Sequence, residues 1–181
     1  RIAELIAKQP RHDRTSMQAA QLDRCSLQAR RLVPVFLEVL PSGRLEDTLR
    51  AWDFCCTAES TGAHAFDLAY RAARGALAAD LGGPWMERML RETELPVWWC
   101  DALDRALADP IMWQGARGAR LHAALDAVAA QEPVPWGEVQ RFTLRHLMLG
   151  GLPSWLGFDR GPYPLPGSVA TVCQGNIVRV D

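Results

Sequence analysis

A stretch rich in glycine and proline, residues 136–176, limits most strongly how this chain can fold. It reads WGEVQRFTLRHLMLGGLPSWLGFDRGPYPLPGSVATVCQGN. Its helix-breaking residues are Gly150, Gly151, Pro153, Gly157, Gly161, Pro162, Pro164, Pro166 and Gly167. Glycine and proline at this density stop any long helix. A loop of this length without its own periodicity is uncommon inside a compact domain, and is usually functional or held against a larger structure.

The chain before this stretch, residues 1–135, is rich in Ala, Leu and Arg and predicts a succession of helices. We expect a first helix over 1–9, which Pro10 stops. A second helix is expected from Ser16, which can cap it, to about residue 40, with a kink at Pro34.

Further helices are expected downstream. Ser60 or Thr61 can cap a long Ala-rich helix that ends at Gly82-Gly83-Pro84. The remaining helices are predicted over 44–52, 85–90, 97–108 and 116–131.

Residues 136–181 form the second region of what we treat as one partial domain. Residues 139–149 are open between strand and helix, because Phe142 and Thr143 favour strand whereas the Leu and Met content permits helix. Residues 170–173 and 177–180 predict short strands. The predicted fold class is therefore α+β, predominantly helical, with short strands near the C-terminal end.

Charge and hydropathy exclude several classes of partner. Lys plus Arg number 20 and Asp plus Glu number 21, which gives a formal net charge of -1 without a basic stripe. Nucleic acid and anionic membranes are therefore poor partners. No apolar run approaches the ~18 residues of a membrane span, and no signal peptide is visible. The chain opens on Arg1 rather than Met, so we expect that an upstream segment has been removed or left out.

The cysteines are odd in number and are Cys25, Cys55, Cys56, Cys100 and Cys173. None lies in a Cys-x-x-Cys or Cys/His spacing that would hold zinc, so no metal site is expected. We expect buried or half-exposed thiols.

Motifs of known catalytic chemistry are missing from the sequence, including G-x-S-x-G, H-E-x-x-H and phosphate-binding glycine loops. His12, His64 and His122 are interpreted as solvated or structural. Three carboxylates, Asp23, Asp53 and Asp159, could pair as acid and base. The favoured interpretation is that they are caps or ion pairs with neighbours such as Arg24 and Arg160.

Several tryptophans could line an apolar pocket, namely Trp85, Trp98, Trp99 and Trp113. Aromatic residues in a helical layer are more often core, and we favour that interpretation.

The order of motifs resembles the late β-chain of the penicillin acylase (penicillin amidase) family, which are N-terminal-nucleophile amidohydrolases. The residues that carry this resemblance are Trp136-Gly137, His146, Asp159-Arg160-Gly161-Pro162, Pro164, Gly167, Thr171-Val172, and upstream Gln21-Leu22-Asp23, Ser26, Ala29, Pro34, Trp52-Asp53 and Ser60. The chain departs from the family pattern at Leu147, where Pro is usual, and at residues 168–170, where a Gly-Asp-rich run is usual.

The resemblance implies a parent enzyme with the four-layer αββα sandwich fold that hydrolyses linear amides through an acyl-enzyme on an N-terminal Ser. That Ser, and the Asn of a Trp-Asn motif that completes the oxyanion hole, precede the region matched here. The chain is therefore expected to be an interior fragment, truncated at both ends, without catalytic residues of its own and inactive in isolation.

Four residues are candidates for supporting the parent's site. Arg1 is the candidate counterpart of a supporting Arg of the family, and His146 lies at the family's His position, where we favour a structural role. Arg160 and Thr171 belong to the matched motifs. Ser168 is rejected as a nucleophile and interpreted as a turn residue, because cleavage before it would leave only a tail of residues 168–181 as the second chain.

The resemblance also implies partners and a location. We expect the remainder of the β-chain, the α-chain and a small N-acyl amide substrate as partners, in the periplasm or outside a bacterial cell. No cofactor is evident; some family members bind a structural calcium ion, and no site for one is readable here. The alternative is a non-enzymatic helical binding or scaffold protein. A fragment should expose a large apolar patch, whereas an independent domain should unfold in one cooperative transition.

Overall fold

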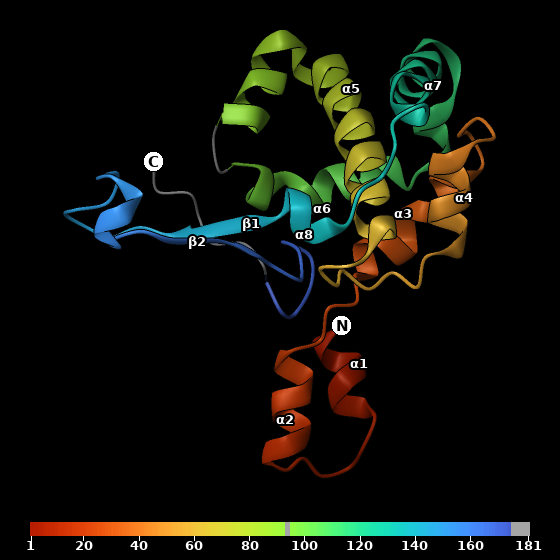
Figure 1. Ribbon diagram of the computed structural model, residues 1–181. Helices are drawn as coiled ribbons and strands as arrows, with labels where there is room; N and C mark the ends of the chain where they lie inside the picture. Colours follow the sequence, from red (N-terminus) through yellow and green to blue (C-terminus); the bar gives the residue numbers. More distant parts are fainter. Residues whose placement is uncertain (93–94, 175–181) are drawn as a thin grey trace.

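The computed structural model describes residues 1–92 and 95–174, without the side chains of 87, 89–100 and 154. The helices are α1 Ile2–Ala7, α2 Arg14–Gln21, α3 Leu27–Leu37, α4 Arg44–Ala51, α5 Thr61–Glu92, α6 Leu95–Leu107, α7 Gly115–Ala129 and α8 Trp136–Val139. The 3-10 helices are η1 Pro110–Trp113 and η2 Ser154–Leu156, and the strands are β1 Arg141–Leu144 and β2 Arg160–Pro164. Figure 1 shows three parts: a helical body, a pair formed by α1 and α2 that projects from it, and an arm formed by β1 and β2.

Helix α5 is the centre of the body, and α3, α4, α6 and α7 pack around it. Its inward face carries Ala65, Ala69 and Ala73, which are fully buried. Small side chains let the neighbouring helices approach closely, and larger residues on those helices fill the space. The largest fully buried side chains of the body are Phe36, Leu32, Leu45, Leu49, Leu77, Leu107, Leu121 and Leu125. Their burial is the main apolar contribution to stability.

The predicted ends of the long helix are confirmed. The Ser60 hydroxyl accepts a hydrogen bond from the Ala63 N–H at 3.2 Å, as an N-cap does. At the other end Gly83 adopts φ 65° and ψ -167°, a conformation that interrupts the helix before a shorter helical segment reaches Glu92. Positive φ is readily accessible to glycine, which explains why the interruption falls there.

The prediction of one helix over 16–40 is wrong, because two capping groups divide it into α2 and α3. Asp13, and not Ser16, is the N-cap of α2: the Asp13 carboxylate accepts from the Ser16 N–H at 2.8 Å. The Ser16 hydroxyl accepts in return from the Asp13 N–H at 2.9 Å, which completes a capping box. Ser26 then starts α3 by accepting from the Ala29 N–H at 3.1 Å.

The open interpretation of 139–149 is resolved in favour of a strand over 141–144 only, because Val139 ends α8 and residues 147–149 lie in a turn. β1 pairs antiparallel with β2, with Arg141 opposite Pro164, Phe142 opposite Tyr163 and Leu144 opposite Arg160. The predicted strand over 170–173 is wrong, because those residues form turns. The strand predicted over 177–180 lies outside the described residues. The chain is thus mostly helical with a small two-stranded sheet, as an α+β fragment should be.

The expectation of unpaired thiols is wrong for two cysteines. Cys25 and Cys55 form a disulfide across an isolated antiparallel bridge, 30 residues apart in sequence. The bridge places the two side chains opposite each other, which the sequence spacing does not indicate. Cys56 is buried and free, and Cys173 is half-buried and free.

Over the described residues, no helix combines the length and the apolar character that crossing a membrane requires.

Candidate functional site

Segments distant in sequence meet beside the first turn of α5, at a place that we call the junction: residues 23–26, 54–58, 136–137 and 167–173. Backbone hydrogen bonds join them in turn. The Ser26 N–H donates to the Phe54 carbonyl at 2.9 Å, and the Cys56 N–H to the Arg24 carbonyl at 2.9 Å. The Gly167 N–H donates to the Cys56 carbonyl at 2.7 Å. The junction therefore brings early and late parts of the chain into one hydrogen-bonded unit.

Trp136 and Gly137 attach the arm to this unit. Trp136 is 5% exposed, and its indole N–H donates to the Gly167 carbonyl at 2.8 Å. The Gly137 N–H donates to the Ala58 carbonyl at 2.7 Å. A Cβ at Gly137 would lie 2.7 Å from the Pro164 Cβ, closer than real Cβ atoms approach. A tryptophan followed by a glycine is therefore required for this packing.

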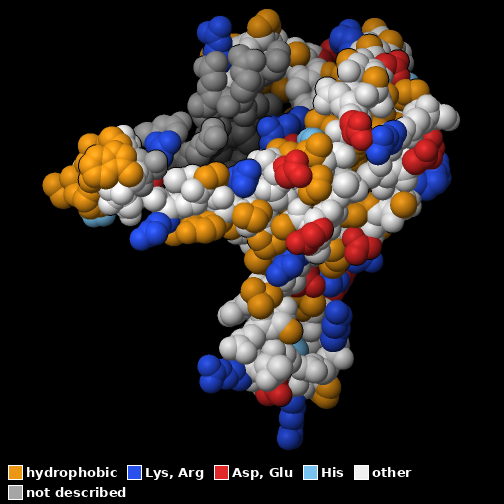
Figure 2. Space-filling model, in the orientation of Figure 1, with side chains coloured by type: hydrophobic (Ala, Val, Ile, Leu, Met, Phe, Trp, Pro, Cys, Tyr) orange, Lys and Arg blue, Asp and Glu red, His pale blue; other side chains and the backbone are white. Residues whose placement is uncertain are grey.

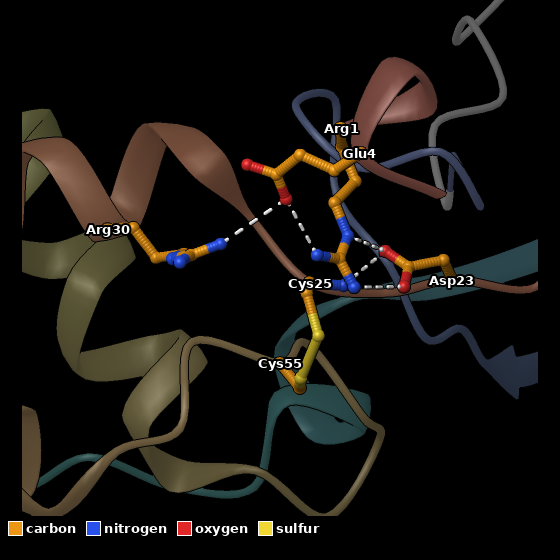
Figure 3. A network of polar contacts seen from close by, with 6 residues as sticks. All are labelled: Arg1, Glu4, Asp23, Cys25, Arg30 and Cys55. Atoms are coloured by element: carbon orange, nitrogen blue, oxygen red, sulfur yellow. Dashed lines mark hydrogen bonds and ion pairs between the residues drawn. A yellow bond between two sulfur atoms is a disulfide. The ribbon is translucent and has the colours of Figure 1, made fainter. Parts of the chain in front are cut away.

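Arg1 lies at the edge of the junction and is held by Asp23 (Figure 3). Its Nε donates to Asp23 Oδ1 at 2.9 Å and its Nη2 to Asp23 Oδ2 at 2.7 Å, a bidentate pair. Its Nη1 donates to Glu4 Oε2 at 2.8 Å, and Arg30 approaches the same oxygen at 3.5 Å. The guanidinium lowers the pKa of Asp23, and the two carboxylates raise the pKa of Arg1. The pair is therefore ionised across the neutral pH range.

Thr171 reaches the same unit from the C-terminal side. It is 5% exposed, and its hydroxyl accepts from the Ser168 N–H at 2.8 Å. The same hydroxyl lies 2.6 Å from the Cys173 carbonyl, to which it can donate. The Cys173 N–H in turn donates to the Asp23 carbonyl at 2.8 Å. Ser168 is a residue of this turn, as its interpretation required, and its hydroxyl accepts from the Ala170 N–H at 3.2 Å.

His146 and Arg160 lie on the arm, not at the junction. His146 is exposed, and its Nδ1 accepts from the Met148 and Leu149 N–H groups, each at 3.2 Å. Asp159 accepts from the His146 N–H at 3.2 Å and the Gly151 N–H at 2.9 Å. These amides lower the pKa of Asp159, with the Gly151 N–H contributing most. His146 and Asp159 thus organise the loop at the end of the arm, and Arg160 is exposed at the start of β2.

The three candidate acid–base carboxylates are not brought together. Asp23 pairs with Arg1 rather than with its neighbour Arg24, Asp159 binds loop amides, and Asp53 accepts from the Cys55 N–H at 2.9 Å in a turn. Asp23 therefore forms an ion pair, as the favoured interpretation held, although with Arg1, and Asp53 and Asp159 bind backbone N–H groups of their own loops.

The candidate tryptophan pocket does not form around the tryptophans whose side chains are described. Trp85 is 67% exposed, whereas Trp113 packs at 6.1 Å from the Phe36 ring and donates to the Leu107 carbonyl at 2.8 Å. Trp113 is therefore half-buried and packs against the core, and Trp98 and Trp99 lie outside the described side chains.

A comparison with known protein families accounts for these motifs. The model of the penicillin amidase family matches residues 1–180. The chain belongs to the penicillin amidase family. No curated protein matches the chain. Membership supports an acylase-like amidohydrolase activity, and it gives the motif residues a common explanation.

Residues that carry the penicillin amidase pattern build the junction and the helix starts that surround it. Asp23 holds Arg1, and Ser26 and Ser60 cap α3 and α5. Trp136 and Gly137 seat the arm. These residues therefore belong to one structural frame, whereas His146, Asp159 and Arg160, which also carry the pattern, lie on the arm.

Sequence reasoning missed two features near this frame. One is the Cys25–Cys55 disulfide. The other is Asp104, which is 4% exposed and accepts from the Tyr70 hydroxyl at 2.7 Å and from Gln28 Nε2 at 2.8 Å. Burial raises the pKa of Asp104. The sequence of this helix does not indicate which partners Asp104 will meet, so neither feature could be found from spacing. In the described part of the chain, no group of three His, Cys, Asp or Glu residues is placed to hold a metal ion.

Proposed function

We propose that this chain is part of an enzyme that hydrolyses the linear amide bond of an N-acyl compound. Its candidate substrates are β-lactam side chains, acyl-homoserine lactones and similar N-acyl amides. The enzyme would form an acyl-enzyme on an N-terminal serine that lies outside residues 1–181. The observation that carries this proposal is the junction, where Asp23, Trp136 and Thr171, all residues of the penicillin amidase pattern, are joined and hold Arg1 at their edge.

The roles of the serines at the junction support a nucleophile elsewhere. Ser26 and Ser60 cap helices, and Ser168 organises a turn through its own hydroxyl. In the proposed mechanism the α-amino group of the external serine accepts that serine's hydroxyl proton while the oxygen attacks the amide carbonyl. The amine then leaves, and water hydrolyses the acyl ester to release the carboxylic acid. Arg1, fixed by Asp23 and Glu4, would hold the edge of the junction in place beside this site.

The arm suggests how the chain meets the rest of the enzyme. Figure 2 shows a hydrophobic surface at the end of the arm, where Leu147 is 99%, Met148 86% and Trp155 81% exposed. Soluble proteins seldom leave clustered apolar side chains exposed unless something binds them. We propose that the remainder of the β-chain or the α-chain covers this surface, and that the helical body supplies a layer beside the sheet of a four-layer αββα sandwich.

The disulfide supports the proposed location. Structural disulfides persist in oxidising compartments such as the bacterial periplasm and the extracellular medium. A Cys25–Cys55 disulfide therefore fits a periplasmic or secreted enzyme.

The test compares two proteins: residues 1–181 alone, and the same residues expressed within their complete reading frame. We expect the complete protein to hydrolyse a chromogenic aryl-acetyl amide and residues 1–181 alone to be inactive. Hydrolysis by residues 1–181, lost when a residue within them is changed, would contradict the proposal. A complete protein that binds but does not cleave N-acyl amides would favour the non-enzymatic binding protein instead.

Arg1 is tested in the same complete protein with a matched control. Arg1→Ala should lower kcat/KM by about tenfold or more, because it leaves the Asp23 carboxylate without its partner and loosens the junction beside the site. Arg11→Ala removes the same charge from the exposed connection between α1 and α2 and should leave kcat/KM unchanged. Equal effects of the two substitutions would remove Arg1 from the proposed site.

A further inference from the structure

The pair of helices α1 and α2 is attached to the body by few groups. Neither helix has a buried residue. Apolar packing therefore contributes little to holding this pair, which Figure 1 shows projecting away from the body. Ile2 and Ile6 remain 61% and 53% exposed. The attachment must depend mainly on polar contacts.

Those polar contacts converge on Asp23. Its carboxylate binds the Arg1 guanidinium through two hydrogen bonds, and the paired side chains are 16% and 11% exposed. Glu4 adds a bridge from α1 to Arg30 of α3, but these side chains are about half exposed, at 47% and 48%, so solvent screens this contact. The Arg1–Asp23 pair is therefore the principal polar link between α1 and the rest of the molecule.

Asp23 lies two residues before the disulfide, in a segment that the disulfide and backbone hydrogen bonds hold together. Its Oδ1 accepts from the Cys25 N–H at 3.2 Å, and Cys25 is bonded to Cys55. The Cys55 carbonyl accepts from the indole N–H of Trp52 at 3.0 Å, and Trp52 is a core residue only 8% exposed. Figure 3 shows the disulfide directly beside the Arg1–Asp23 pair. A continuous connection thus runs from the core through the disulfide to α1.

We propose that the Cys25–Cys55 disulfide is a redox-sensitive latch: when a dithiol reduces it, the segment that carries Asp23 loosens, the Arg1–Asp23 pair opens and α1 is released from the junction. Both cysteines are partly exposed, so a reductant can reach them. The helices of the body remain folded, because their apolar core does not include the latch.

The chemistry requires one dithiol per latch. A thiolate of the dithiol attacks one sulfur of the disulfide, and the other cysteine leaves as a thiolate that takes a proton. The second thiol of the reductant then attacks the mixed disulfide, which frees the second cysteine and oxidises the dithiol to its own disulfide. Two electrons and two protons pass to the protein, and the latch is left as two thiols.

Release is measured by amide hydrogen exchange on the complete protein, oxidised and after treatment with dithiothreitol. The proposal goes beyond the proposed function, because its readout is backbone exchange and not hydrolysis. We expect amides of residues 2–22 to exchange at least about tenfold faster after reduction, as loss of a charge-assisted link predicts. Amides of α7 should change much less. An equal acceleration of exchange in α7 would show that the disulfide stabilises the whole fold and does not act on α1 in particular. An unchanged exchange rate in residues 2–22 would show that reduction does not release them.

Three variants separate the latch from side effects of the reductant. The double variant Cys25→Ser/Cys55→Ser should reproduce the reduced pattern without dithiothreitol. Asp23→Asn should release residues 2–22 with the disulfide intact, and reduction should then accelerate them little further. Arg11→Ala removes an exposed charge from the same segment and should leave the oxidised pattern unchanged. Residues 2–22 that remain protected in Asp23→Asn would overturn the role of the Arg1–Asp23 pair.

Discussion

Trp136 offers the sharpest test of the junction, through the substitution Trp136→Phe. Phenylalanine retains an aromatic ring but removes the indole N–H that donates to the Gly167 carbonyl at 2.8 Å. Because Trp136 is only 5% exposed, water cannot readily replace that donor. An unsatisfied buried acceptor costs about 1–3 kcal/mol. The smaller ring leaves unfilled space and adds to this cost.

The change is measured by urea and thermal denaturation, followed by far-ultraviolet circular dichroism. At roughly 3 °C per kcal/mol for a chain of this size, the expected decrease in Tm is about 3–9 °C. Trp155→Phe is the matched control, because Trp155 is 81% exposed on the arm. It should change the free energy of unfolding by less than about 0.5 kcal/mol. Equal stability of both variants and the wild type would refute the argument that Trp136 joins the arm to the body.

Three further predictions follow from individual residues. Gly137→Ala should lower the free energy of unfolding by about 1–3 kcal/mol through overpacking, since its Cβ would lie 2.7 Å from the Pro164 Cβ. Gly75→Ala is the control, because Gly75 lies in an open position on α5, and it should raise the free energy of unfolding by about 0.5–1 kcal/mol. If urea denaturation shows that both variants change the free energy of unfolding in the same direction, the packing described for Gly137 is wrong. Burial raises the pKa of the Cys56 thiol to about 11. Iodoacetamide at pH 8 should therefore label Cys173 well before Cys56, as followed by mass spectrometry. Equal labelling rates for the two thiols would refute the burial of Cys56. Burial also raises the pKa of Asp104 above its ordinary value, so protonation of Asp104 favours the folded state. The free energy of unfolding should therefore fall as pH rises through the folded-state pKa. Urea denaturation across pH should show a weaker fall for Asp104→Asn, and equal pH slopes for the variant and the wild type would contradict the raised pKa.

The helical body could be predicted from the sequence because its information is local. Ser60 precedes the long helix and caps it, and the apolar residues Leu121 and Leu125 recur at helical spacing on α7. Local capping chemistry also explains the one wrong helix. Asp13 and Ser26 are better caps in context than Ser16 alone, so the chain starts two helices where one was expected.

The details of the junction could not be predicted because they depend on contacts between distant segments. Arg1 meets Asp23 across 22 positions and Cys25 meets Cys55 across 30, and no local pattern encodes either pairing. At residues 170–173 the local composition itself was misleading. Their composition suits a strand, but the Thr171 hydroxyl binds the Ser168 and Cys173 backbone, and the segment turns instead. The family resemblance pointed to Trp136 and Thr171, which lie in the junction, and also to His146 and Arg160, which lie on the arm. It did not reveal how any of them contact one another.

The most direct test of the central claim is to find the residue that carries the acyl group. The complete protein is treated with an aryl sulfonyl fluoride, which modifies activated serines, digested and analysed by mass spectrometry. We predict one adduct, on a serine at a newly formed N-terminus outside residues 1–181, with parallel loss of amide hydrolysis. An adduct on a residue within 1–181 that accounts for the lost activity would contradict the claim that this chain supports the site and does not supply its nucleophile.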